Sequence, residues 1–302
     1  MLIVGAGMSG MLAAHYFRHL NPTIIEKQET LPNNHKALLR FRSEAVSDLT
    51  GIPFKKVSVS KCIKYGDVII HVPDIFLCNN YSFKTTGAIR SRSISNLDDC
   101  TRYIAPSDFI NKLSTGLAIN YDTEFTTNLL EYKEPIISTM PVYLLAKALG
   151  YEGLPHLKTK PISTLAFELD MDIDVYQTVY FPGDEPYYRA SITGNRFIVE
   201  TAEEDIDDLD MPLVYESMLH ILDSAFGIDY KGDAKLELNH QPYGKLIECD
   251  TNEVKKFIGW ASNTHNIYSL GRWGTHRQIL MDDVVNDIKV IDKMIRSNNY
   301  ER

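Results

Sequence analysis

The chain has 302 residues, 44% of them hydrophobic and 24% charged, and a formal net charge of −9. This composition is that of a globular protein and excludes a disordered, collagen-like or coiled-coil chain. No apolar run approaches the ~20 residues of a membrane span, and no basic signal-peptide region opens the chain, so we expect no membrane association. The four cysteines are far apart and form no CxxC pair, which disfavours a disulfide framework and makes the cytoplasm the expected compartment.

The charge is unevenly distributed along the chain. Residues 36–108 carry 11 basic and 7 acidic residues, a net +4, whereas residues 168–237 carry 4 basic and 18 acidic residues, a net −14. One interpretation is that both charged segments lie on surfaces exposed to solvent. Alternatively, the basic segment faces an anionic ligand, with Lys36, Arg40 and Arg42 as phosphate contacts and Arg90 and Arg92 as weaker candidates. The negative total argues against general nucleic-acid binding, although a nucleic-acid partner is left open.

The first 26 residues form the most informative pattern. They predict, in order, a strand, a glycine-rich turn, a helix and a second strand that ends in a carboxylate: Met1–Val4, Gly5-Ala-Gly7-Met8-Ser9-Gly10, Met8–Leu20 and Thr23–Glu26. A GxGxxG turn between a strand and a helix, followed by an acid about 20 residues later, is typical of a dinucleotide site.

Each part of this pattern has a physical reason. Gly5 permits the tight turn, Gly7 lets the backbone approach a pyrophosphate, and Gly10 lets the helix pack closely on the strand. The helix N-terminus, at Met8 and Ser9, offers free N–H groups and a positive dipole to phosphates. Glu26, with Lys27 beside it, would accept the ribose hydroxyls and repel a 2′-phosphate, so FAD or NAD is expected rather than NADP.

Further along the chain, helices and strands alternate irregularly. The pattern predicts helices over Ala37–Leu49, Ser107–Leu113, Val142–Leu149, Pro212–Phe226 and Met281–Ile295. It predicts strands over Val57–Val59, Val68–Val72, Ile75–Cys78, Leu117–Thr127, Glu134–Pro141, Ala234–Leu238 and Ile267–Leu270. An antiparallel sheet is expected from Thr164–Leu169, Gln177–Phe181, Tyr187–Ile192 and Arg196–Glu200.

The predicted fold class is α/β. A Rossmann-like FAD-binding domain of the glutathione-reductase type is interleaved with a mostly antiparallel β substrate domain. We expect residues 1–50, 107–150 and 245–302 to form the FAD-binding domain, and residues 51–106 and 151–244 to form the substrate or cap domain. This interleaving favours a flavoprotein over an ordinary NAD dehydrogenase, because a C-terminal strand and helix must complete a sheet begun at residue 1.

The C-terminal segment Ile267–Asp282 resembles the closing motif of the UDP-galactopyranose mutases, in which a strand ends in Gly-Arg and Met-Asp opens the last helix. The N-terminal unit is similar to the FAD enzymes of the amine-oxidase and mutase superfamily. Pro186–Arg189 resembles the Tyr-x-Arg strand of the mutases, and Pro135–Pro141 the superfamily strand that runs into a proline near the flavin. His276 stands where the mutases carry a tyrosine.

These patterns give a set of candidate site residues. The resemblance implies that Pro141 and the closing motif hold the flavin half of FAD, with contacts from Gly271, Arg272, Trp273, Gly274, Met281 and Asp282. Arg272 would pair with the pyrophosphate or, alternatively, form a salt bridge with Asp282 or Asp283. The candidate catalytic residues are Tyr188, Arg189 and His276, of which Arg189 is expected to bind a substrate anion. The histidine and acid spacings predict no metal site.

The leading hypothesis is an FAD-dependent oxidoreductase of the amine-oxidase type, which removes a hydride from a small or nucleotide-linked anionic substrate, at a C–N bond. A non-redox flavin-dependent mutase, a flavoenzyme that modifies nucleotides or nucleic-acid bases, and a protein with purely structural FAD stay open as alternatives. The oligomeric state is not predicted.

Overall fold

The computed structural model describes residues 1–31, 39–89, 93–131, 134–155, 157–171, 174–201, 210–232, 234–247 and 251–300. Lys36, Arg90 and Arg92 lie outside these residues. The chain folds into two compact units, each assembled from separate stretches. The first comprises residues 1–55, 103–157 and 249–302, and the second comprises residues 56–102 and 158–248.

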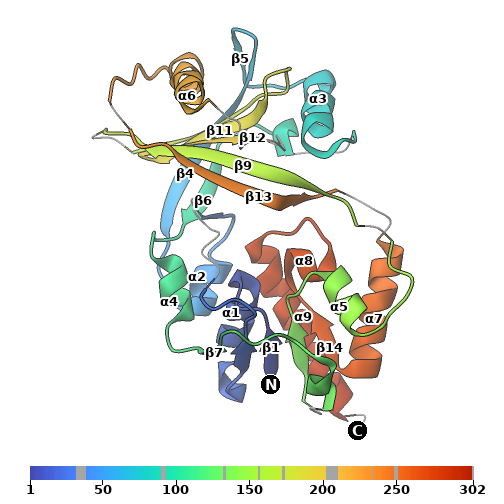
Figure 1. The fold of residues 1–302 in the computed structure, drawn as a ribbon. Helices are drawn as coiled ribbons and strands as arrows, with labels where there is room; N and C mark the ends of the chain where they lie inside the picture. The colour runs from blue at the N-terminus through green and yellow to red at the C-terminus, as the bar shows by residue number, and fades with distance from the viewer. Residues whose placement is uncertain are drawn as a thin grey trace. The chain divides into compact units, whose positions relative to one another are not determined.

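The first unit is built on a parallel five-stranded sheet (Figure 1). Its strands lie in the order β14 (Ile267–Ser269), β8 (Ile136–Ser138), β1 (Leu2–Val4), β2 (Thr23–Ile25) and β7 (Ala118–Asn120). Strand β2, the next strand in the chain, pairs with one edge of β1. Strand β8, which begins more than a hundred residues after β2 ends, pairs with the other edge of β1. The strand order therefore reverses between β1 and β8, and open α/β sheets bind ligands at the carboxyl edge of such a switch point.

Helices cover both faces of this sheet, because the strands are apolar on both faces. Ile3 and Ile24 point into one core with four helices, and Val4 and Ile136 point into the other core with two. The first layer contains α1 (Met8–Tyr16), α2 (Ala45–Thr50), α4 (Phe109–Ser114) and α9 (Met281–Tyr300). The second layer contains α5 (Val142–Ala148) and α7 (Asn252–His265).

The larger sheet has nine strands. Eight follow the order β13 (Glu237–Leu246), β9 (Thr159–Glu168), β12 (Arg196–Thr201), β11 (Tyr187–Gly194), β10 (Val175–Tyr180), β4 (Lys55–Tyr65), β6 (Cys100–Ile104) and β3 (Arg40–Phe41). The ninth, β5 (Val68–Ile70), pairs with β4. The pairs from β13 to β10 are antiparallel, whereas β10 and β4 are parallel.

Two helices pack on the β-rich unit. Along α6 (Met211–Phe226), Met218 and Leu222 pack against Phe167 and Phe197 of the sheet. On α3 (Ile75–Thr86), Leu77 and Tyr81 join a separate cluster with Tyr180 and Tyr188.

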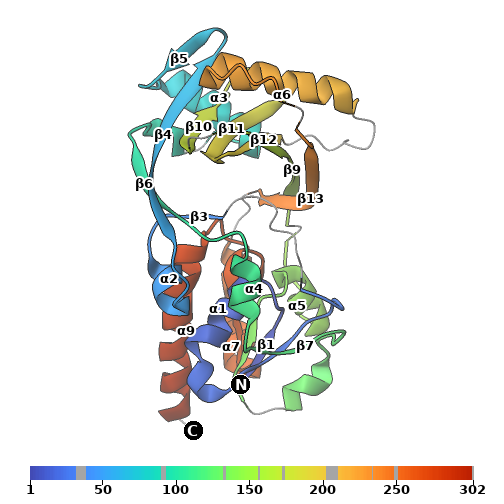
Figure 2. The same ribbon diagram turned by 90° about the vertical axis from the view of Figure 1, so that its left-hand side faces the viewer.

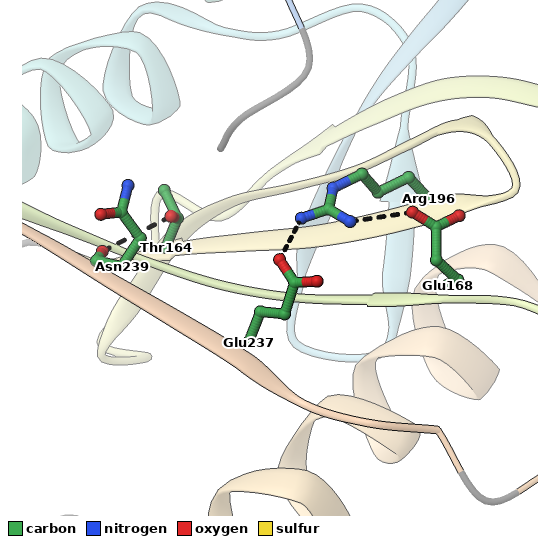
Figure 3. Close-up of polar contacts among 5 residues, drawn as sticks. All are labelled: Thr164, Glu168, Arg196, Glu237 and Asn239. Atoms are coloured by element: carbon green, nitrogen blue, oxygen red, sulfur yellow. Dashed lines mark hydrogen bonds and ion pairs between the residues drawn. The ribbon is translucent and has the colours of Figure 1, made fainter. Parts of the chain in front are cut away.

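An arginine ties three neighbouring strands of this sheet together. Arg196 of β12 donates through Nη1 to Glu168 on β9 (2.8 Å) and through Nη2 to Glu237 on β13 (2.7 Å) (Figure 3). Burial alone would lower the pKa of Arg196, but the two carboxylates raise it above its usual value. Further along the same strands, Thr164 donates to the carbonyl of Asn239 at 3.5 Å (Figure 3). These contacts fix the register of β13 on β9.

The predicted fold class is confirmed, as are the N-terminal strand–helix–strand unit and the four-stranded antiparallel sheet. The predicted helices at α4, α5, α6 and α9 are also present. None of the helices in the described ranges is both long and apolar enough to cross a membrane.

Two predicted elements were wrong in type. The segment Ile75–Cys78, predicted as a strand, opens helix α3, because Asp74 caps it by accepting from the Leu77 N–H (2.8 Å) and Leu77 and Tyr81 repeat at helical spacing. In the predicted helix Ala37–Leu49, residues 37 and 38 lie outside the described residues. The rest holds strand β3 before α2 begins at Ala45.

Other predicted elements were wrong in extent. The long strand expected over Leu117–Thr127 is only Ala118–Asn120, since Asp122 turns the chain with a φ of +49°. Strand β13 runs to Leu246, well beyond the predicted Leu238. Helix α7 was not predicted, and neither was the short helix α8 (Gly271–Thr275) that follows β14.

The two aspartate caps differ in geometry and give a matched test. Asp74 accepts at 2.8 Å at the start of α3, whereas Asp210 accepts from Leu213 at 3.4 Å at the start of α6. We expect Asp74→Ala to lower the free energy of unfolding by about 1 kcal/mol and Asp210→Ala to lower it by less than about 0.5 kcal/mol. Urea unfolding measures both, and equal losses would contradict the geometric argument.

Candidate functional site

The turn after β1 brings the start of α1 against the end of the strand. Gly5 has a φ of +98° and donates its N–H to the Ile25 carbonyl at 2.8 Å. A Cβ added to Gly10 would lie 2.0 Å from the Gly5 carbonyl oxygen. Only glycine therefore fits at position 10, which agrees with the predicted role of close packing between helix and strand.

Two further turns meet this one at the carboxyl edge of the parallel sheet. Thr139, after β8, donates through Oγ1 to the Val4 carbonyl (2.9 Å), and a Cβ on Gly5 would lie 2.3 Å from that Oγ1. A Cβ on Gly271, after β14, would lie 2.6 Å from the Ser9 Oγ in the first turn of α1. The ends of β1, β8 and β14 thus converge on one place.

The glycines of the closing motif pack against the chain itself. A Cβ on Gly274 would lie 3.1 Å from the Ser138 carbonyl oxygen and 3.4 Å from that of Met140. We expected Gly271 and Gly274 to leave room for a ligand. Contacts with Ser9 and Ser138 already account for both glycines.

Gly7 differs from these glycines. It precedes α1 with a φ of −65°, no side chain of the described residues caps the helix, and apart from its chain neighbours no described heavy atom would lie within 4 Å of its added Cβ. The space over Gly7 is therefore open, and the N–H groups of the first turn of α1 border it. Of the neighbours, Met8 is buried in the core and Ser9 is half-buried.

Glu26 is buried at the end of β2, beside the glycine turn. Its Oε2 accepts from the Ala6 N–H at 2.7 Å, and its Oε1 accepts from the Gln28 N–H at 3.0 Å. The carboxylate thus holds the turn in place. A carboxylate has about four acceptor positions, so it can accept further hydrogen bonds as well.

The other candidates near the first unit's loops have contacts within the chain. Lys27 forms an exposed ion pair with Glu124 (2.8 Å), which raises the pKa of Lys27 through their hydrogen bond. The Asp282 carboxylate accepts from the N–H groups of Ser43 (2.9 Å) and Arg42 (3.2 Å), so it fixes the start of α2. Arg40 is half-buried on β3.

Asp282 and Asp283 both lie in the first turn of α9, which Met281 opens. Asp283 accepts from the Leu280 N–H at 2.8 Å. These two carboxylates already compensate the positive end of the dipole of α9.

Arg272 is a cation in a largely desolvated position. It lies one residue after Gly271, and its Nη2 donates to the Ile279 carbonyl at 3.3 Å. Burial lowers its pKa. No carboxylate of the described residues forms an ion pair with it, so the alternative of a salt bridge with Asp282 or Asp283 was wrong. A half-buried guanidinium that has no carboxylate partner among the described residues favours an anionic ligand.

Of the remaining candidates of the first unit, Trp273 and His276 follow Arg272 in sequence, whereas Pro141 follows strand β8. Trp273 lies in α8 and is half-buried. His276 ends α8 in the left-handed conformation, with a φ of +46°, and is buried. Pro141 precedes the first residue of α5.

The two candidates of the second unit are adjacent on β11. Arg189 donates through Nη2 to Glu200 on β12 at 2.6 Å and through Nε to the other oxygen of the same carboxylate. Desolvation would lower the pKa of Arg189, but Glu200 raises it well above its usual range. We expected a substrate to supply the anion that Arg189 needs. Glu200 already supplies an anion, so burial of Arg189 does not by itself require a substrate.

Tyr188 is buried, and Lys245 lies over its ring with Nζ 3.4 Å from the centroid. The pairing of β11 with β12 shifts register between Tyr187 and Arg189. As a result, Tyr187 packs against Phe181 in the cluster under α6, on the same side as Ala190, whereas Tyr188 packs in the cluster with Tyr81. Action of Tyr188 or Arg189 on a substrate stays a prediction.

A pocket of about 520 Å³ lies within the second unit, beside Tyr188. Its polar lining includes Asn80, Lys84, Lys160 and Glu185. Lys84 donates to the carbonyls of Phe181 (2.9 Å) and Gly183 (2.8 Å), and burial lowers its pKa. The sequence analysis missed this pocket, because helix α3 was predicted as a strand.

Thr139 was also not predicted as a residue of this site. It contacts Val4 and Gly5, which lie more than 130 residues earlier, so no local pattern indicates its position. Over the ranges that the structure describes, no three His, Cys, Asp or Glu side chains gather to hold a metal ion.

No family model matches the sequence, and no curated protein sequence matches it. Several solved structures superpose on this chain over most of its length. Reduced UDP-galactopyranose mutase superposes with a TM-score of 0.67 at 12% identity, over 97% of this chain and 93% of that chain. An oxidoreductase from Methanosarcina mazei gives a TM-score of 0.61 at 9% identity, over 97% of this chain and 99% of that chain.

A structure named as an FAD-containing monooxygenase, from Photorhabdus luminescens subsp. laumondii TTO1, gives a TM-score of 0.53 at 12% identity. The match covers 99% of this chain and 88% of that chain. At these identities the likeness defines the fold: this chain has the α/β fold of the Rossmann-type flavoproteins.

Gly10 and Gly7 give a matched pair for stability. We expect Gly10→Ala to lower the free energy of unfolding by about 3 kcal/mol, because its Cβ would overlap the Gly5 carbonyl oxygen. Gly7→Ala should change it by less than about 0.5 kcal/mol, since its Cβ meets open space. Urea unfolding compares the two, and an unchanged Gly10→Ala variant would show that the turn is built differently.

Arg189 and Glu200 give a second test. Arg189→Met should lower the free energy of unfolding by about 1–2 kcal/mol, because it removes the ion-pair partner of the half-buried Glu200 carboxylate. The double variant Arg189→Met/Glu200→Met should recover most of this loss. If the single variant is as stable as the wild type, the ion pair is not what holds Arg189.

Proposed function

We propose that this chain is an FAD-dependent oxidoreductase whose first unit binds the cofactor. The observation that carries the proposal is Arg272, a desolvated guanidinium without a carboxylate partner in the described chain, one residue from the contact between Gly271 and Ser9. A pyrophosphate is the anion that such a position on a Rossmann-type sheet favours.

The residues around the carboxyl edge of the sheet fit this cofactor. The open space over Gly7 and the uncapped N-terminus of α1 suit phosphate oxygens. The acceptor positions left on Glu26 suit the ribose hydroxyls. FAD, when bound, accepts a hydride and passes the electrons to an acceptor.

The proposed substrate is more specific than the proposed cofactor, and fewer observations support it. The resemblance to the amine oxidases supports oxidation at a C–N bond, and the pocket beside Tyr188, with Lys84 and Lys160 in its lining, supports a small or nucleotide-linked anionic substrate. The first unit would then bind the cofactor, and the β-rich unit would bind the substrate.

A non-redox mutase is a second candidate. The superposition on UDP-galactopyranose mutase, with a TM-score of 0.67, favours it. An anaerobic titration separates the two functions. An oxidase substrate bleaches the yellow flavin, whereas a mutase substrate leaves the oxidised spectrum unchanged and turns over only after chemical reduction.

The cofactor assignment is tested on purified protein. We expect a yellow protein that releases FAD, identified by chromatography, on denaturation. Arg272→Met should weaken FAD binding by about 10- to 100-fold through the loss of charge-assisted hydrogen bonds. Gly7→Val should abolish binding by filling the space over the turn while leaving the fold intact.

Arg277→Met is the matched control, because Arg277 lies in the same segment but forms an ion pair with Asp287. It should retain normal FAD content. Release of NAD alone, absence of any cofactor after reconstitution, or normal FAD affinity in both Arg272→Met and Gly7→Val would overturn the proposal.

A further inference from the structure

The pocket beside Tyr188 is lined by charged side chains that are not equally available to a ligand. They are Lys84, Lys160, Asp184 and Glu185. Helix α3 supplies Lys84, β9 supplies Lys160, and the segment between β10 and β11 supplies the two acids. Helix α3 lies against β11 of the larger sheet (Figures 1 and 2). All of these elements belong to the second unit, so the pocket is formed within one compact unit.

Lys84 already has partners for its ammonium group. Its Nζ donates to the carbonyls of Phe181 and Gly183 and lies 3.6 Å from Oε2 of Glu185. These three partners match the three donors of an ammonium group. Lys84 and Glu185 therefore hold the wall of the pocket, and their charges cancel.

Lys160 differs from Lys84. It is half-buried on β9, and it forms no hydrogen bond or ion pair with the residues that the structure describes. Its Nζ lies 3.9 Å from the position of a Cβ added to Gly87, the residue that ends α3. The negative end of a helix dipole favours a cation at this position. Lys160 thus offers a charged ammonium group to a ligand in the pocket.

A second lysine adds positive charge on the same side of the sheet. Lys245 on β13 lies directly opposite Lys160 on β9, so the two side chains share one face. The Nζ of Lys245 lies 3.4 Å from the centroid of the Tyr188 ring, and Tyr188 lines the pocket. Like charges in directly opposite positions destabilise a sheet. An anion in the pocket would relieve this repulsion.

The rest of the lining suits a small ligand with a flat apolar part. Phe83 and Tyr188 supply aromatic rings. Asn80 is half-buried and forms no hydrogen bond within the described ranges, so its amide can donate to a ligand oxygen. Asp184 is exposed to solvent, which screens its charge. A volume of about 520 Å³ is in the range of pockets that bind small molecules.

We propose that this pocket binds the phosphate group of a phosphorylated small molecule, with Lys160 in contact with the phosphate and Lys245 as a second positive charge. A phosphate monoester carries a charge of about −1.5 to −2 at pH 7, which matches the two lysines better than a carboxylate does. Its oxygens can accept from Lys160 and Asn80 together. Identification of this ligand as the substrate rests on the proposed function, whereas its binding does not.

The experiment is a calorimetric titration of the FAD-loaded full chain with phenyl phosphate, benzoate and phenol. These probes carry the same ring and are a dianion, a monoanion and a neutral molecule. We expect phenyl phosphate to bind about 10-fold more tightly than benzoate, and phenol not to bind. Lys160→Met should weaken the binding of phenyl phosphate by about 10-fold or more. Lys160→Arg should retain most of the affinity, because it keeps the charge.

Lys235→Met is the matched control, because Lys235 is exposed two residues before β13 and lies outside the lining of the pocket. It removes the same charge and should leave the affinity for phenyl phosphate unchanged. Lys245→Met should weaken binding by about 3-fold, since its charge acts from a greater distance than that of Lys160.

The proposal is overturned if phenyl phosphate does not bind to the wild type, if benzoate binds as tightly, or if Lys160→Met and Lys235→Met have equal affinities. The FAD content is measured before and after each titration. Loss of FAD during the titration would assign the anion to the cofactor site and would also overturn the proposal. If the purified chain holds no FAD but shows the expected dependence on Lys160, only the proposed function fails.

Discussion

The contact between Gly10 and the carbonyl of Gly5 is the constraint on which the first unit depends. A Cβ at Gly10 would lie 2.0 Å from that oxygen, so the helix can start directly against the strand only without a side chain. The same turn receives Thr139 from the end of β8 and meets Gly271 from the end of β14. All three strands are parallel, and the carboxyl ends of parallel strands share one edge. Segments more than 250 residues apart must therefore meet there, and the chain can leave to build the β-rich unit and return.

The glycines at this edge fall into two physical groups that a sequence motif does not distinguish. At Gly10, Gly271 and Gly274, a side chain would strike another part of the chain, so these glycines are explained by packing. At Gly7 an added Cβ would strike none of the described residues beyond its chain neighbours, so packing among them gives no reason for a glycine. A glycine of this kind at the uncapped N-terminus of a helix agrees with our proposal that a phosphate approaches the backbone there.

The parts of the fold that could be predicted from the sequence are those with local determinants. The glycine turn and the alternating strands of the antiparallel sheet carry their determinants within a few residues. The parts that could not be predicted depend on distant partners. The start of α2 follows Ser43, whose N–H is held by Asp282, and no local pattern relates these two residues. Helix α3 begins with the apolar run Ile75–Leu77, which also suits a strand, and burial of Tyr81 against Tyr180 and Tyr188 adds to the Asp74 cap in favour of a helix.

Arg189 and Arg272, the two arginines predicted to bind anions, also depend on partners that the local sequence does not reveal. Either could serve an anionic ligand, because burial of a guanidinium demands a negative partner. Arg189 faces Glu200 on the neighbouring strand, and the register of β11 on β12 makes that pairing part of the sheet. Arg272 follows a strand end, where no neighbouring strand places a carboxylate against it in the described chain. The position of a cation relative to the sheet thus separates Arg189, which has a carboxylate on the neighbouring strand, from Arg272, for which we propose an anionic ligand at the carboxyl edge of the first unit.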